Sequence, residues 1–474
     1  MSDPCSLEVP DILAEFDGKS LGDARLNECL RRIVALAAPD PGRSFPDQME
    51  SVADREALYR FLANPKVTLA GVLSGHVRQT HDRMRGRGLV RIVHDTSTFQ
   101  FLGDRDGLGV LRGGAKGFLA HVALAVAADE TREPLGVLGV HPYIHEDAVA
   151  HTGMTRSQRV AATRVKSRAE KESARWEQMA VSVSGELPDG VEALHVMDQE
   201  ADDYDLLAAV HEVALRYVIR ADPMRQTTDA KLGVKEVLAR QPGTLFRTVP
   251  LNPRGAKKAI KTRGRHPERV ERMATLHVRW ATVTIKRRRY SDARIPTLTM
   301  QAVHVIETAP PPGETPIEWM LFTSEPVRTL EDATAVVDHD RARRLIEEYF
   351  KALKTGCAFE KRQLTNLAGL VRALSVFVPM AWRLLLLRHL SRATPAASVN
   401  HLFDAEQRLL LRKLLKRRGY RMPPRPSMRD ARLGIAALGG HIKNNGAPGW
   451  LVLGRGFTRF LETEIGWRLA REEM

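Results

Sequence analysis

The amino-acid sequence predicts an α/β protein with a mixed β-sheet, an antiparallel β insertion and helical regions at both ends of the chain. Three short apolar runs follow one another between residues 89 and 140, and each has the length and composition of a buried strand. Two further runs, 193–197 and 215–219, are separated by helical segments, so the chain must return to the sheet through crossovers. Alternating apolar and polar residues at 275–285 and 297–305 predict the antiparallel insertion.

The predicted strands of the sheet are followed by polar residues. The first strand, 89–93, ends at His94-Asp95-Thr96, and the fourth, 193–197, ends at Asp198. A helical segment over 204–213 leads to the fifth strand, which ends at Arg220. Of the residues that follow these strands, the carboxylates Asp95 and Asp198 occupy places that a metal site would use.

The first 75 residues are predicted to be helical. Residues 53–62 have apolar side chains at helical spacing and are followed by Asn64-Pro65, which stops a helix. The region contains no distinctive helix-turn-helix, so the pattern suits a small DNA-binding unit and a plain packing unit equally well.

The remaining segments complete the predicted organisation. The β insertion occupies about 226–312, and one long helix is expected over about 330–354. Residues 374–474 are predicted to be mainly helical, with a break at the proline-rich segment 422–426.

Composition and charge exclude several classes of protein. The chain has 474 residues, 43% of them apolar, which is too many for wholesale disorder. No stretch approaches the roughly 18 apolar residues that span a bilayer, no secretory signal opens the chain, and three cysteines lack metal-ligand or disulfide spacing. The sequence therefore predicts a protein of a reducing cytoplasm without a membrane partner. Its net charge of +15 predicts a polyanionic partner, most simply nucleic acid.

The positive charge is concentrated in two segments. Residues 247–289 contain fourteen Lys or Arg against two acidic residues, and 408–425 contain basic residues without an acidic one. A single basic run is usually a solvated face. Two such runs on either side of acidic motifs favour a channel that binds DNA phosphates, which would position a duplex without reading its sequence.

Three carboxylates stand where a metal site would use them. Asp95 and Asp198 follow two strands, and Glu347 lies on the helix after the insertion. Mg²⁺ prefers oxygen ligands, and two such ions can activate a water or a 3′-hydroxyl for phosphoryl transfer. For each carboxylate taken singly, the favoured explanation is that it caps a helix or ends a strand. An aspartic protease is disfavoured, because Asp95-Thr96-Ser97 lacks both a following glycine and a second copy.

The helix that carries Glu347 also carries cations. Arg343, Glu347, Lys351 and Lys354 are spaced by four, four and three residues, so they are predicted to share one helix face. The common explanation of this pattern is a ladder of salt bridges. The pattern also suits a metal ligand flanked by side chains that hold phosphates.

At these residues the sequence resembles a known family, the bacterial cut-and-paste insertion-sequence transposases of the Asp-Asp-Glu type, in the branch with a Tyr-Arg-Glu-Lys signature. The resemblance covers nearly the whole chain and is most specific around Asp198 and Glu347. The matching stretches are 59–64, 94–97, 170–176, 198–202, 319–326, 346–356 and, more weakly, 431–467.

The resemblance implies an RNase H-like catalytic domain over 76–373, between a DNA-binding domain at 1–75 and a C-terminal dimerisation domain at 374–474. It implies that Asp95, Asp198 and Glu347 bind two Mg²⁺ ions, for which Mn²⁺ could substitute. Nicking, hairpin formation and strand transfer would follow at transposon ends, catalysed by a homodimer assembled on double-stranded DNA near the bacterial nucleoid.

The resemblance also implies which residues contact DNA: Arg220, Trp319, Arg343, Lys351 and Lys354. Trp319 matches an aromatic residue that receives a flipped base, and stacking on an indole would recover part of the cost of extruding that base. The strand pattern of 319–322 alone predicts instead that Trp319 is a core residue.

One position departs from the signature, since Asp340 stands where the tyrosine is expected. A tyrosine hydroxyl can donate to a phosphate, whereas an ionised aspartate repels one. Two alternatives therefore stay open beside an active transposase: a catalytically decayed, transposase-derived DNA-binding protein, and a stand-alone nuclease that cleaves without regard to end sequence.

Overall fold

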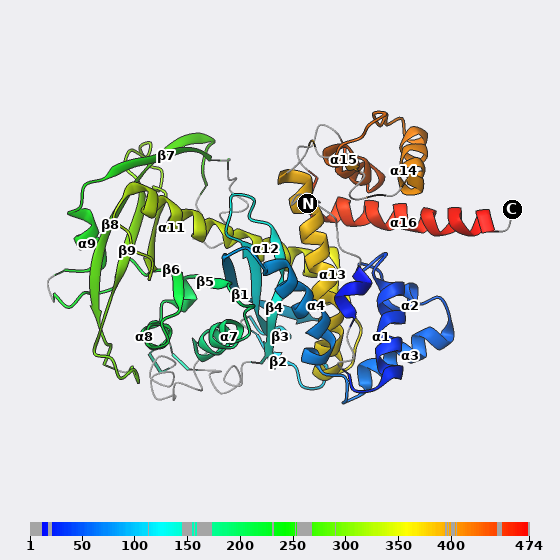
Figure 1. Ribbon diagram of the computed structural model, residues 1–474, viewed down its shortest axis with the longest axis horizontal. Coiled ribbons are helices and arrows are strands. Elements are labelled where there is room, and N and C mark those ends of the chain that lie inside the picture. Colours follow the sequence, from blue (N-terminus) through cyan, green and yellow to red (C-terminus); the bar gives the residue numbers. More distant parts are fainter. Residues whose placement is uncertain are drawn as a thin grey trace.

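The computed structural model places a large sheet at one end of the molecule and mainly helical regions at the other (Figure 1). The structure describes residues 12–17, 21–111, 113–144, 154–155, 157–158, 173–229, 232–251, 253, 268–289, 291–393, 396, 398–399, 403, 405–442 and 448–472.

Ten strands of the described chain form one mixed sheet, in the order β2-β3-β1-β5-β6-β10-β9-β8-β7, and β4 pairs with β3 along the edge opposite β1. The strands are β1 (Leu89–Phe101), β2 (Gly109–Val110), β3 (Lys116–Ala127), β4 (Pro134–Tyr143), β5 (Glu192–Met197), β6 (Arg216–Arg220), β7 (Thr244–Leu251), β8 (Arg272–Lys286), β9 (Thr297–Glu307) and β10 (Glu318–Thr323). The predicted mixed α/β class is confirmed.

The central strands combine both directions of pairing. β1 is antiparallel to β3 and parallel to β5, and β5 is parallel to β6. The strands of the insertion are antiparallel, as predicted, and they extend the same sheet because β10 joins β9 to β6. The insertion therefore widens the central sheet.

Strand β1 is longer than predicted, so the expectation that Asp95 ends it is wrong. Pairing with β3 continues from Asp95 to Phe101, opposite Val122 to Lys116. Phe99 and Phe101 are buried in this continuation and stack on Phe118. Asp95 consequently lies in the interior of a paired strand, opposite Val122 of β3, whereas the pairing with β5 reaches only Val93.

Helices cover both faces of the sheet (Figure 1). On one face α7 packs on β3, β4 and α8, and on the other α11 packs across strands from β1 to β10. The helices of this central region are α7 (Ser173–Gly185), α8 (Tyr204–Glu212), α9 (Val234–Ala239), α11 (Leu330–Ala342) and α12 (Arg344–Lys351).

The predicted single helix over 330–354 is interrupted, so that expectation is wrong. The amide of Arg343 bonds to the carbonyl of Asp340, and the amide of Ile346 bonds to the carbonyl of Arg343. Both bonds span three residues, which tightens the chain into a turn between α11 and α12. A π-helical segment, η4 (Ala352–Gly356), then follows α12 and carries Lys354.

The N-terminal region is helical, as predicted. Its described elements are η1 (Ile12–Phe16), α1 (Ala24–Ala37), α2 (Phe45–Gln48), α3 (Val52–Ala63) and α4 (Leu69–Met84). Ser51 caps α3 through a reciprocal pair of hydrogen bonds with Asp54. The expected boundary after residue 75 falls inside α4, which packs on β4 and α13.

The C-terminal region is also helical, with α13 (Leu367–Ala393), α14 (Ala405–Arg417), α15 (Met428–Leu438) and α16 (Trp450–Glu472). The expected boundary at 373/374 falls inside α13, which packs against α3, α4 and β4 in the interior. By length and composition alone, Leu367–Arg392 could cross a membrane, but 72% of its most apolar window is buried inside the protein. We therefore treat α13 as a core helix.

Candidate functional site

Asp95 and Asp198 lie side by side on neighbouring parallel strands. Val93 on β1 pairs with Val196 on β5, and each aspartate stands two residues beyond its member of this pair. Asp198 begins the short 3₁₀ turn η3 (Gln199–Ala201), where its Oδ1 accepts a hydrogen bond of 2.8 Å from the amide of Glu200. Local strand pairing and capping thus fix both carboxyl groups.

Arg343 connects this pair to Glu347. The side chain is 14% exposed, and its Nη1 lies 3.9 Å from Oδ2 of Asp95 while its Nη2 lies 3.0 Å from Oε1 of Glu347. The interruption between α11 and α12 places Arg343 at the start of α12, one helical turn before Glu347. The structure therefore brings Asp95, Asp198, Glu347 and Arg343 into one site.

The electrostatics of the two aspartates reflect this proximity. Burial, followed by the negative charge of Asp198, raises the pKa of Asp95 to about 7, although Arg343 and the Thr96 amide oppose the shift. Burial also raises the pKa of Asp198, against the effects of the Glu200 amide, Arg343 and Arg220. Two carboxylates that repel each other in a partly buried place are stabilised by an added cation.

The fit of these residues to a divalent metal is partial. The oxygen donors of Asp95, Asp198 and Glu347 have the chemistry that Mg²⁺ prefers. Within the described residues, however, no group of three or more His, Cys, Asp or Glu side chains is arranged to hold a metal ion together. In this conformation Arg343 bonds to Glu347 and lies beside Asp95, so it neutralises the charge that a metal ion would neutralise.

Besides Arg343, two of the predicted DNA-contacting cations have protein partners. Arg220 at the end of β6 donates from Nε and Nη2 to Oδ1 and Oδ2 of Asp340, at 2.9 and 2.8 Å. Lys354 donates to the carbonyl of Thr98 and lies 4.0 Å from Glu360. Burial lowers the pKa of Lys354, which Glu360 and Asp95 oppose.

The other two predicted DNA contacts lie in contrasting environments. Lys351 is the exposed last residue of α12. Trp319 on β10 is partly buried against the apolar cluster that contains Val303 and Leu321. Its buried Nε1 has no hydrogen-bond partner in the part of the chain that is described. The packing of Trp319 matches the core role that the strand pattern predicted, and its role with a flipped base stays a prediction.

The first predicted basic segment is described only in part. Residues 254–267, with many of its lysines and arginines, lie outside the described residues. Arg247 on β7, together with Arg132 and Arg341, contacts the single carboxylate of Asp338. Three arginines around one aspartate leave an excess of positive charge at Asp338, which lies on α11.

Some arginines of the second predicted basic segment make hydrogen bonds within the protein. Arg412 on α14 donates to the carbonyl of Pro424, and Arg418 donates to the carbonyls of Ala437 and Leu438. These arginines connect α14 and the residues that follow it to neighbouring segments through hydrogen bonds. The sequence alone did not indicate these bonds.

A chain of buried histidines, which no sequence pattern predicted, lies directly behind Asp95. His94, His121 and His195 are fully buried, and His94 Nε2 lies 2.9 Å from His195 Nδ1. The chain ends at Ser184 Oγ, 2.8 Å from His195, and at Thr96 Oγ1, 2.9 Å from His121. The only signal in the sequence was strand alternation, which turns His94 and Thr96 away from Asp95.

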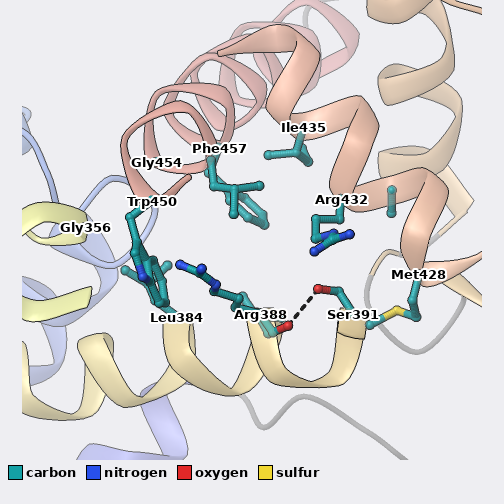
Figure 2. Close-up of a pocket in the computed structure, with 13 residues that line it drawn as sticks. Gly356, Leu384, Arg388, Ser391, Met428, Arg432, Ile435, Trp450, Gly454 and Phe457 are labelled. Atoms are coloured by element: carbon teal, nitrogen blue, oxygen red, sulfur yellow. Dashed lines mark hydrogen bonds between the residues drawn. The ribbon is translucent and has the colours of Figure 1, made fainter. Parts of the chain in front are cut away.

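An apolar pocket lies elsewhere, where α13, α15 and α16 meet (Figure 2). Figure 2 shows the Arg388 side chain extending toward Trp450. The Cζ of Arg388 lies 4.3 Å from the centre of the Trp450 ring. None of the predicted site residues lines it. The pocket belongs to the packing of the C-terminal helices, whereas the candidate site lies at β1, β5 and α12.

The fold and the site define an α/β protein with an acidic cluster flanked by arginines and a lysine. Residues 12–67 match a protein-family model described as Transposase DNA-binding. This match supports DNA as a partner and a relationship to transposases. It covers far less than half of the chain, so it does not assign the whole chain to a family.

One solved structure with a related description is a piggyBac transposase synaptic complex with hairpin DNA, determined by cryo-electron microscopy. The match has 10% sequence identity and a TM-score of 0.35, and it covers 98% of this chain and 85% of the other. A TM-score this low does not establish a common fold, so the likeness carries no weight for fold or function.

Proposed function

We propose that the protein is a DNA transposase that cleaves and joins DNA at transposon ends by metal-dependent phosphoryl transfer. The observation that carries the proposal is the meeting of Asp95, Asp198 and Glu347 around Arg343. It occurs in a chain whose N-terminal helices match the Transposase DNA-binding model. An acidic cluster of this kind has little use in a protein that only binds DNA, because it repels phosphates.

The central sheet in this proposal is an RNase H-like core. The antiparallel order β4-β3-β1, continued by the parallel strands β5 and β6, supports the assignment. Asp95, Asp198 and Glu347 would hold two Mg²⁺ ions, or Mn²⁺ in their place, and the metal would activate the attacking oxygen and stabilise the departing one.

The protein's own side chains bind and orient the DNA. Arg343, Lys351 and Lys354 present cations beside the carboxylates, where they can hold the phosphates that flank the reacting bond. Arg343 would exchange its present partner Glu347 for a phosphate, which frees that carboxylate for the metal. Trp319 would receive a flipped base when a hairpin forms.

Two DNA ends require two active sites, so the proposed active form is a homodimer assembled on DNA. The successive steps are nicking, hairpin formation, hairpin opening and joining of the 3′ end to target DNA. The C-terminal helices after α13 are the region that we assign to dimerisation.

The substitution Asp198→Asn tests the proposal. It should abolish cleavage of a duplex that contains the transposon end in Mg²⁺, while binding to the same duplex stays measurable. Asp104→Asn is a matched control, because it makes the same chemical change in a side chain that is 93% exposed. Cleavage retained by the Asp198 variant would refute the assignment.

The alternative function is a catalytically decayed, transposase-derived DNA-binding protein, and Asp340 is the observation that favours it. The wild-type protein, incubated with Mn²⁺ and its own element ends, separates the two. A pure binding protein yields no nicked product, and a stand-alone nuclease cuts whether or not the end sequence is present.

A further inference from the structure

Asp340 is buried in an ion pair of well-defined geometry. Its side chain is 1% exposed, and both of its oxygens accept hydrogen bonds from Arg220. The side chain lies in the last turn of α11, three residues before the interruption that presents Arg343. A paired, buried carboxylate in this place does not face an incoming phosphate, so the repulsion expected from the sequence does not apply.

Arg220 bonds to Asp340 and also interacts electrostatically with Glu347 and Asp198 of the candidate site. It ends strand β6, the parallel neighbour of the strand that precedes Asp198. Asp340, Glu347 and Asp198 all raise the pKa of Arg220, although burial, the largest effect, opposes them. Its side chain is 38% exposed, and its Nη1 has no hydrogen-bond partner among the described residues. One edge of the guanidinium is therefore fixed by Asp340, and the other is available.

Without Asp340, Glu347 and Asp198 of the candidate site are the carboxylates whose charges still act on Arg220. Arg220 would then compete for Asp198 or Glu347, in addition to Arg343, which already bonds to Glu347. A planar guanidinium held through two parallel hydrogen bonds keeps one orientation, whereas a single charge contact does not fix it.

We propose that Asp340 is a positioning residue, whose carboxylate holds Arg220 beside the acidic cluster in the orientation that contacts a DNA phosphate and keeps it away from Asp198 and Glu347. Asp340 therefore replaces the signature tyrosine functionally. This inference rests on the proposed function. It makes a counterintuitive prediction, since restoring the signature with Asp340→Tyr impairs the protein.

The test compares four variants of the full chain with wild type: Asp340→Tyr, Asp340→Asn, Arg220→Gln and the double variant Arg220→Gln/Asp340→Asn. Cleavage kinetics are measured on a duplex with the transposon end. Loss of an orienting partner typically costs about 10–100-fold in activity. We expect a loss of that size for Asp340→Tyr and Asp340→Asn, mainly as a higher KM for DNA. In the Arg220→Gln background, Asp340→Asn should cost nothing more.

Glu307→Gln is the matched control for a merely structural role. Glu307 is 2% exposed and pairs with Arg272 in the insertion, away from the acidic cluster. Breaking this pair lowers stability, which reduces the amount of folded enzyme without changing the KM of the folded fraction. Asp340→Tyr with a wild-type KM and kcat would overturn the inference. The inference would also be overturned if Asp340→Asn reduced cleavage activity equally in the wild-type and the Arg220→Gln backgrounds.

The outcome stays distinguishable from failure of the proposed function. If wild type cleaves no DNA in Mg²⁺ or Mn²⁺, the enzyme proposal fails, and the same four variants are compared by DNA affinity. If Asp340→Asn weakens DNA binding in the wild-type background but not in the Arg220→Gln background, the two residues are coupled and the orienting role is supported. If the losses of DNA affinity in the two single variants simply add in the double variant, the orienting role is refuted.

Discussion

The two faces of strand β1 have opposite electrostatic character, although adjacent residues supply them. On one face Asp95 lies beside Asp198 and Arg343, in a site that is charged and partly open to solvent. On the other, His94 belongs to a chain of fully buried histidines closed by Ser184 and Thr96. Strand alternation thus separates a face that can do chemistry from a face that holds the strand in place.

The buried face is stable because its histidines are neutral. Burial lowers the pKa of His195 to about 4 and, together with His141 and Arg175, that of His121 to about 3. A neutral imidazole donates one hydrogen bond and accepts one, so a chain of three can satisfy both nitrogens of each ring. On the charged face the polar groups are not fully satisfied, since its carboxylates remain incompletely paired until a cation binds.

The largest expected effect is on the charged face. Asp95→Asn should reduce DNA cleavage by more than the roughly 100-fold that loss of an orienting partner costs. Because the change removes repulsion from Asp198, the free energy of unfolding should not fall. Cleavage assays and urea unfolding on the same preparation test both parts. Destabilisation by Asp95→Asn would contradict the division of roles between the faces.

The next effect is on the buried face. His195→Phe leaves His94 and Ser184 without the ring nitrogens to which they bond, so the free energy of unfolding should fall by about 1–3 kcal/mol. The kcat of the folded fraction should change little. His195→Gln is the control, since an amide can both donate and accept, and it should recover part of the loss. A large fall in kcat with unchanged stability would assign the histidines a direct role in the chemistry.

The same histidines predict how stability depends on pH. Their folded-state pKa values lie below the ordinary value of 6.5, so folding favours the neutral form. The stability they contribute is complete above pH 6.5 and is lost as the pH falls towards about 4, because the unfolded chain binds protons first. Each histidine contributes a slope of up to about 1.4 kcal/mol per pH unit. Urea unfolding between pH 7 and 4 measures the slope, which should be smaller in His195→Gln.

The sequence predicted the features that depend on local pattern. Continuous apolar runs located the central strands, including those next to Asp95 and Asp198, and alternation of apolar and polar residues located the insertion. The end of β1 was missed, because residues 96–101 become a strand through pairing with β3. The interruption at Arg343 was missed because it is not encoded in the periodicity of residues 330–354.

The partners in the site were also inaccessible to sequence reasoning. Arg220 and Asp340 are 120 residues apart, and nothing near either residue indicates the other. The histidine chain joins positions 94, 121 and 195 from three strands, so it exists only once the register is fixed. Metal binding and dimerisation depend on molecules outside a single chain, and they stay predictions.

The smallest expected effect is at Lys351, the exposed cation at the end of α12. If it contacts one phosphate, Lys351→Ala should weaken DNA binding a few-fold and reduce the slope of log affinity against log salt by about 0.9. Lys351→Arg keeps the charge and should leave the slope unchanged. Lys354→Ala should behave differently, because Lys354 also donates to Thr98 and its loss affects the strand that carries Asp95. Titrations at several salt concentrations compare the three variants. Equal slopes for wild type and Lys351→Ala would remove Lys351 from the DNA-binding surface.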